Sequence, residues 1–137
     1  PYPAPYDKPH DLALVLTYDI SPRWSVAANW IYSSGIPYTL PSGRYVVAGN
    51  ILPLYTGRND YRLPAYHRLD LSVTLRGKQK PGRRWRGEWN LSAYNAYARK
   101  NIWTLNFVQD AANPEETYAE MTYLFPIVPA ITYNFKF

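Results

Sequence analysis

The strongest constraint on this chain is a strict two-residue alternation near its C-terminal end. From Phe125 to Phe137 every second residue is apolar or aromatic, apart from one proline, and the opposite parity is polar at Thr132 and Asn134. Successive side chains of a β-strand point to opposite faces of the sheet. The pattern therefore predicts a strand over residues 121–137 with one apolar and one polar face.

The same alternation predicts four earlier strands. They cover residues 10–20, 23–33, 66–76 and 85–95. In the third, the polar parity carries Arg68, Asp70, Ser72, Thr74 and Arg76. That side is too polar for the core of a soluble protein and suits a hydrated or plugged interior. The sequence thus predicts an all-β, antiparallel chain with five main strands.

The connections between these strands alternate between short and long. Residues 21–22 and 77–84 form short turns, whereas residues 35–65 and 96–120 form long connections. Long loops are uncommon in compact soluble domains, whereas outer-membrane barrels have long external loops and short periplasmic turns. Within the long connections we expect short β-pairing around residues 45–47, extended chain over 102–108 and an acidic loop over 109–120.

Aromatic residues stand at both ends of the 23–33 strand. Trp24 and Tyr32 are eight residues apart, roughly 26 Å along a strand. At a tilt of about 40° this gives about 20 Å of height, close to the apolar band of about 25 Å in outer-membrane barrels. Trp and Tyr are enriched at both membrane interfaces. We therefore predict interface positions for Trp24, Trp30, Tyr32, Trp85 and Trp89.

Composition excludes several other classes of protein. No apolar run approaches the roughly 20 residues of a membrane helix, and the absence of cysteine excludes disulfides and thiolate metal sites. The negative mean hydropathy is compatible with a barrel, because every second side chain faces the lumen. The net charge is +5, and the cations of residues 76–86 lie among turn-forming Gly77, Pro81 and Gly82. We favour a solvated turn over nucleic-acid binding for this cluster.

Three strings, in order along the chain, resemble the last strands of TonB-dependent receptors from Bacteroidota-type bacteria. They are RLPAYHRLDLSVTL (62–75), WNLSAYNAYARKN (89–101) and LFPIVPAITYNFKF (124–137). The string SSGIPYTLPSGRY (33–45) resembles the start of one of their large external loops. The resemblance implies an antiparallel transmembrane β-barrel of about 22 strands in the bacterial outer membrane. Residues 1–137 would supply about five C-terminal strands, and the plug and the earlier strands would lie outside this sequence.

The resemblance also implies a function and partners. External loops would capture a scarce nutrient, and a plug would shift under TonB-coupled force to let it pass the barrel wall. The expected partners are the plug and remaining strands of the same receptor, the TonB complex reached through the N-terminal part, the barrel-assembly machinery, lipid and a surface lipoprotein. No nucleic acid and no cofactor is expected.

Two alternatives remain open. The chain could belong to a non-transporting barrel that serves as a structural or assembly partner in an envelope complex. It could instead form a soluble β-sandwich binding module, which would need a second sheet over the face of Leu69, Leu71 and Leu75.

The candidate site residues fall into three further groups. Aromatic rings and guanidinium groups of the long connection could stack on or grip a ligand: Tyr38, Arg44, Tyr45, Arg58 and Tyr61. Charged residues of the polar parity would face the lumen and plug: Arg68, Asp70, Arg86 and Glu88. The resemblance assigns the barrel-assembly signal to the last aromatic residues of the chain: Tyr133, Phe135 and Phe137.

The sequence gives no indication of catalysis. It contains no nucleotide-binding loop, metal-binding histidine pair or nucleophile elbow. Asp70 and Glu88 could be considered as a glycosidase pair. Pairing with Arg68, Arg76 or Arg86 is favoured instead, because charges removed from water are usually matched. We therefore do not expect an enzyme.

Overall fold

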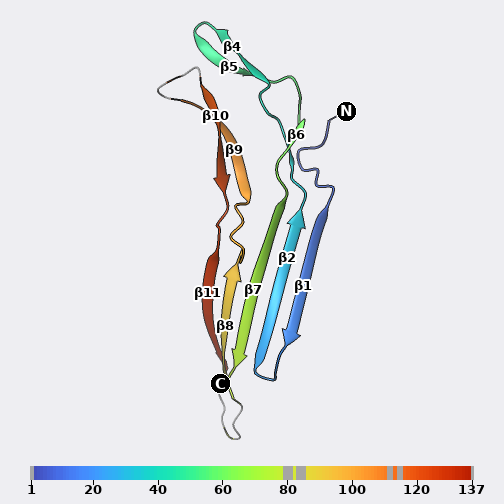
Figure 1. The fold of residues 1–137 in the computed structure, drawn as a ribbon, viewed down its shortest axis with the longest axis vertical. Coiled ribbons are helices and arrows are strands. Elements are labelled where there is room, and N and C mark those ends of the chain that lie inside the picture. The colour runs from blue at the N-terminus through green and yellow to red at the C-terminus, as the bar shows by residue number, and fades with distance from the viewer. Residues whose placement is uncertain (1, 79–81, 83–85, 111–112, 114–115, 137) are drawn as a thin grey trace. The chain divides into compact units, whose positions relative to one another are not determined.

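The computed structural model is all-β and describes residues 2–78, 82, 86–110, 113 and 116–136 (Figure 1). Its strands form antiparallel sheets, as predicted. They are β1 (Asp11–Asp19), β2 (Trp24–Ser33), β3 (Pro37–Tyr38), β4 (Gly43–Val47), β5 (Asn50–Leu54), β6 (Tyr61–Arg62), β7 (Tyr66–Arg76), β8 (Arg86–Tyr94), β9 (Ile102–Gln109), β10 (Thr117–Tyr123) and β11 (Val128–Lys136). Across these residues, no helix has the length and apolar character needed to cross a membrane.

The chain divides into two compact units. Unit 1 comprises Pro1–Asp11, Ser33–Tyr66 and Ile102–Leu124, and unit 2 comprises Leu12–Tyr32, His67–Asn101 and Phe125–Phe137. Unit 2 is built on the five-stranded sheet, and unit 1 is built on three two-stranded sheets.

Four of the predicted strands and the C-terminal part of the fifth form the sheet of unit 2, in the order β1-β2-β7-β8-β11 (Figure 1). We call the end of this sheet where β1 finishes and β2 begins its turn end, and the opposite end its loop end. β7 finishes and β8 begins at the turn end as well, and β11 finishes there. At the β1–β2 turn, Ser21 and Trp24 exchange two backbone hydrogen bonds, with N–O distances of 3.1 and 3.2 Å.

The register of the strands places the apolar parities of β7, β8 and β11 on one face. Leu75 lies opposite Trp89, which lies opposite Tyr133, and Leu91 lies opposite Ile131. Directly opposed residues of an antiparallel pair share a face. We call this the apolar face. Leu91 is 58% and Ile131 69% exposed, so none of the described residues forms a second layer over them.

The opposite face of the same strands is polar and is joined by side-chain hydrogen bonds. Asn90 lies opposite Thr74, and its Nδ2 donates to the Thr74 hydroxyl over 2.9 Å. Asn134 lies opposite Glu88 and donates to the carboxylate over 3.2 Å. The predicted division into an apolar and a polar side is therefore present across three neighbouring strands.

The prediction of one continuous final strand over 121–137 is wrong. β10 ends at Tyr123 and β11 begins at Val128, and the two strands pair with different partners, β9 and β8. Pro126 lies in the interruption; it has no backbone N–H and restricts the residue before it to extended conformations. The two-residue alternation continues through this break, which is why the pattern did not reveal it.

The acidic loop predicted over 109–120 is wrong in part, because its C-terminal portion belongs to β10. Glu120 lies opposite Asn106, and Tyr118 lies opposite Val108. The extended chain predicted over 102–108 is β9. Hydrogen bonding between the two strands outweighs the negative charge that suggested a loop.

Unit 1 confirms the pairing expected around residues 45–47. β4 and β5 form a hairpin in which Val47 lies opposite Asn50. The two residues between them, Ala48 and Gly49, have φ values of 50° and 81°. A two-residue turn with positive φ at both positions matches the right-handed twist of the strands it joins. β3 and β6 pair through two residues each.

Candidate functional site

Asp70 is the centre of a polar network at the loop end of unit 2. Its Oδ2 accepts from Arg68 Nε over 3.0 Å and lies 2.9 Å from Arg68 Nη2. Its Oδ1 accepts the backbone N–H of Asn95 over 3.0 Å. Arg68 also donates to the Tyr94 hydroxyl over 2.6 Å and lies 4.0 Å above the centre of that ring. The predicted pairing of Asp70 with an arginine is confirmed, and both of its carboxylate oxygens accept hydrogen bonds.

Asn95 joins three segments of unit 2 and is only 1% exposed. Its Nδ2 donates to the carbonyls of Arg99 and Phe125 over 2.9 and 3.1 Å, and its Oδ1 accepts from the Arg99 backbone over 3.2 Å. Its φ is 52°, a conformation that asparagine tolerates better than most residues. The side chain thus fixes the end of β8, the turn after it and the approach to β11.

Asn101 completes the pairing of β7 at the same end. It is 4% exposed; its Oδ1 accepts the His67 N–H over 3.2 Å and its Nδ2 donates to the His67 carbonyl over 3.0 Å. The amide thereby takes the place of a neighbouring strand. Neither Asn95 nor Asn101 follows a periodic pattern, so their structural roles could not be predicted from the sequence.

The four residues predicted to face the lumen lie in two places. Arg68 and Asp70 lie in the loop-end network, whereas Arg86 and Glu88 lie on β8 near the turn end. Glu88 is opposite Arg76 and Asn134 in the register, and Arg86 is opposite Lys136. All four belong to the polar parity of their strands.

Aromatic side chains gather near both ends of the sheet in unit 2. At the loop end, four rings form a chain of contacts. The ring centres of Trp30 and Tyr32 are 6.1 Å apart, and those of Trp30 and His67 are 6.5 Å apart. The His67 ring centre lies 5.5 Å from that of Tyr97. Toward the turn end, Trp89 lies 4.6 Å from Tyr133, and Tyr133 lies 6.4 Å from Phe135. Trp24 begins β2 at the turn end and is 43% exposed. Trp85 and Phe137 lie outside the described residues.

A cleft of about 1120 Å³ in unit 1 brings together part of the predicted ligand-binding set. Tyr38 and Arg44 line it, and the Tyr38 hydroxyl donates to the Leu105 carbonyl over 2.5 Å. Tyr45, Arg58 and Tyr61 are not among its lining residues. The cleft also has lining residues that the sequence analysis did not propose, above all Tyr55, Asn106, Phe107, Glu116 and Tyr118. Most of these lie on or beside β9 and β10, and the first part of β10 falls within the predicted acidic loop.

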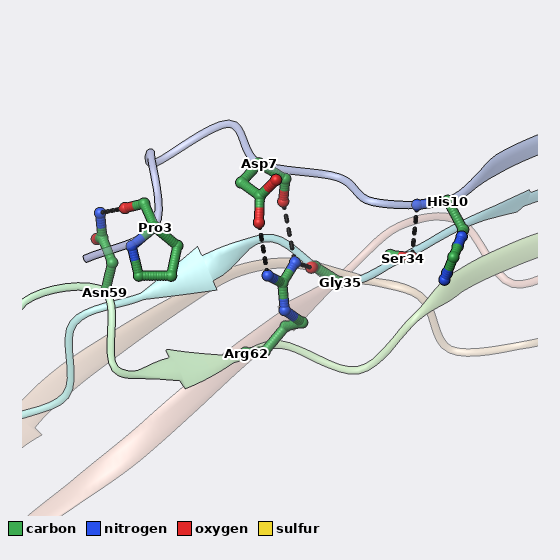
Figure 2. Close-up of polar contacts among 7 residues, drawn as sticks. All are labelled: Pro3, Asp7, His10, Ser34, Gly35, Asn59 and Arg62. Carbon is green, nitrogen blue, oxygen red and sulfur yellow. Dashed lines mark hydrogen bonds and ion pairs between the residues drawn. The ribbon is translucent and has the colours of Figure 1, made fainter. Parts of the chain in front are cut away.

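Arg62 attaches the N-terminal segment to unit 1 (Figure 2). Its guanidinium reaches the Asp7 carboxylate over 2.7 Å, the Asp7 carbonyl over 3.0 Å and the Gly35 carbonyl over 2.7 Å. Nearby, Asn59 Nδ2 donates to the Pro3 carbonyl over 2.7 Å. The N-terminal segment is therefore held by specific polar contacts.

Arg58 takes part in the same attachment. Its guanidinium donates to the Tyr2 hydroxyl over 3.3 Å and lies 4.8 Å from the centre of the Tyr2 ring. Further along, the Ser34 hydroxyl accepts the His10 N–H over 3.1 Å (Figure 2). In this structure Arg58 thus contacts the N-terminal segment and not the cleft.

Within the described part of the chain, no group of three or more His, Cys, Asp or Glu residues is arranged to hold a metal ion. Comparison with protein-family models, with curated proteins and with solved structures found no match to this chain.

Proposed function

We propose that this chain is the C-terminal part of a TonB-dependent outer-membrane receptor, and that the sheet of unit 2 is a section of its barrel wall. The observation that carries the proposal is the exposed apolar face of β7, β8 and β11. Leu91, Trp89 and Ile131 lie on this face and are between 51% and 69% exposed. Contiguous apolar surface of this kind is rare on soluble monomers and marks contact with protein or membrane.

The aromatic clusters support lipid as the neighbour of this face. Trp and Tyr prefer the level of the lipid headgroups, where the ring is half in the apolar layer and its polar atom is in water. In unit 2 the clusters lie toward the two ends of the aliphatic positions, with Trp30 and Tyr32 at one and Trp89 and Tyr133 at the other. A barrel wall needs this arrangement at both of its rims.

The polar face supports an interior that holds water or a plug. Asn90, Thr74, Glu88 and Asn134 are hydrogen-bonded across the strands. The soluble sandwich would require a second sheet on the apolar face, and none of the described residues covers Leu91 or Ile131.

The order of the sheet supports a larger barrel. β1 and β11 are its two edges, and edge strands present a row of backbone groups for pairing. In hydrocarbon each unsatisfied backbone group costs several kcal/mol, so sheets span membranes only as closed barrels. On this proposal, strands outside this sequence complete a barrel of about 22 strands.

The transport role places the cleft of unit 1 among the external loops. Its tyrosines, with Arg44, would contact the nutrient before it passes the plug.

The alternative is a non-transporting envelope scaffold. The two functions differ in whether the protein takes up a nutrient with energy supplied by the TonB complex. Uptake by cells that express the full-length protein should be lost when the TonB complex is deleted, whereas a scaffold would show no uptake in either strain.

The barrel itself is tested by gel migration of the full-length protein in mild detergent, before and after boiling. A closed barrel resists the detergent and migrates faster before boiling. Equal mobility of the two samples would contradict the proposal.

A further inference from the structure

Two adjoining cavities at the turn end of unit 2 are strongly basic. The larger, about 640 Å³, is lined by five cations and one carboxylate. The smaller, about 280 Å³, is lined by three cations and no carboxylate. Both cavities share five lining residues: Arg23, Gly77, Lys78, Arg86 and Gly87.

The carboxylates near these cavities leave the positive charge in excess. Glu88, the acidic residue of the larger cavity, accepts a hydrogen bond from Asn134. Asp19 lies 3.4 Å from Arg76, and both of these side chains are largely exposed. Even with both carboxylates counted, the larger cavity carries five cations against two carboxylates. An anion is therefore the ligand that this end of the sheet favours.

The smaller cavity adds an apolar wall beside the cations. Leu75, Trp89 and Tyr133 line it, and they are direct neighbours across β7, β8 and β11 on the apolar face. A free inorganic anion would gain nothing from this wall. Arg86 belongs to the polar parity of β8 but also lines this cavity at the end of the sheet. An amphiphilic anion would place its charged group on Arg23, Lys78 and Arg86 and its hydrocarbon along the neighbouring apolar face.

The backbone brings the two parts of the site close together. The Gly77 N–H donates to the Gly87 carbonyl over 2.8 Å. A Cβ on Gly77 would lie 2.8 Å from that same oxygen, too close for a carbon–oxygen contact. Glycine at this position thus permits the approach that places Lys78 beside Arg86.

We propose that the turn end of the sheet binds the phosphodiester headgroup of an anionic phospholipid, held by Arg23, Lys78 and Arg86, with its acyl chains along Leu75, Trp89 and Tyr133. This inference rests on the proposed function, because it requires lipid against the apolar face. Basic pockets beside membrane-spanning elements recognise anionic headgroups in this way.

The test uses the full-length protein in nanodiscs that contain phosphatidylglycerol and phosphatidylcholine. The lipids retained after extraction into mild detergent are counted by native mass spectrometry. The wild type should retain phosphatidylglycerol in clear excess over its share of the bilayer. In the K78Q/R86Q variant this enrichment of phosphatidylglycerol should fall about fivefold for each charge removed, roughly 25-fold in total.

Two further variants separate charge from folding. K78R/R86K keeps both charges and should keep the preference. K8Q/K100Q removes two charges that line neither cavity and should behave like the wild type. A preference unchanged in K78Q/R86Q would overturn the proposal, as would displacement of the lipid by millimolar inorganic phosphate, which would identify a site for the free anion.

Failure of this inference can be told apart from failure of the proposed function. A protein that migrates faster before boiling but shows no preference for phosphatidylglycerol would retain the barrel and lose the headgroup site. A protein with equal mobility before and after boiling would lose both.

Discussion

At the scale of single residues, Asn95 is the position with the most consequences. Its side chain satisfies the carbonyls of Arg99 and Phe125 inside unit 2. Its removal takes the amide donor away from these partly buried carbonyls, and a hydrogen bond lost in this way costs about 1–3 kcal/mol. The contact with Phe125 spans thirty residues of sequence, so no local pattern could have predicted it.

We predict that Asn95→Ala destabilises the full-length protein by about 3 kcal/mol, and that Asn95→Gly is less harmful by about 1 kcal/mol. Both lose the side-chain hydrogen bonds, but glycine adopts the positive φ without strain. The midpoint of urea unfolding, followed by the gel shift of the folded band, measures both. Asn134→Ala, at an exposed position on the polar face, is the control and should change stability little. Equal losses for Ala and Gly would show that the positive φ contributes nothing.

The second prediction at this scale concerns two ion pairs that differ in burial. Asp70→Asn removes the charge that pairs with Arg68, whose side chain is 18% exposed, and should cost about 1.5–3 kcal/mol. Asp19→Asn breaks the exposed pair with Arg76 and should cost well under about 1 kcal/mol. The same unfolding assay compares them. A loss for Asp19→Asn as large as that for Asp70→Asn would contradict the account of the network.

At the scale of elements, period-two alternation predicted β1, β2, β7 and β8 to within one or two residues. It worked because each strand has one apolar and one polar face, which is the physical cause of the pattern. It failed at β10 and at the start of β11. The acidic residues Glu116 and Glu120 made β10 resemble a loop. The two-residue alternation continues across Pro126, so it concealed the interruption before Val128. The partners of a strand depend on contacts distant in sequence, which alternation does not record.

The β4–β5 hairpin provides a prediction at this scale. Ala48 has a positive φ of 50° in its two-residue turn, a conformation that asparagine adopts more readily than alanine. Ala48→Asn should stabilise the hairpin by about 1 kcal/mol, seen as slower amide exchange in Tyr45 and Leu52, which lie opposite each other. Ala48→Val should accelerate that exchange, because a β-branched residue is unfavourable at positive φ. Unchanged exchange in both variants would argue against this turn.

At the scale of the whole molecule, the sheet of unit 2 has one side that is unfavourable in water and one side that is hydrogen-bonded. The sequence predicted both sides, because alternation fixes which residues share a face. Only Tyr38 and Arg44 of the residues that line the cleft of unit 1 were predicted, and part of its wall comes from the β9–β10 hairpin. Import, the plug and the remaining strands are proposals that rest on the resemblance and on the need to close a sheet in lipid.

The most direct test of lipid contact compares two neighbouring positions of β11 by fluorescence. A single cysteine replaces Ile131 in one variant and Thr132 in another, in a full-length protein that has no other cysteine. Each cysteine is labelled with an environment-sensitive dye. The labelled protein is then placed in bilayers that contain brominated lipid, which quenches a dye in contact with it. Leu91 and Asn90, their register partners on β8, provide a second pair. The dye at positions 131 and 91 should be strongly quenched, and the dye at 132 and 90 weakly. Equal quenching at the two parities would contradict a lipid-facing wall.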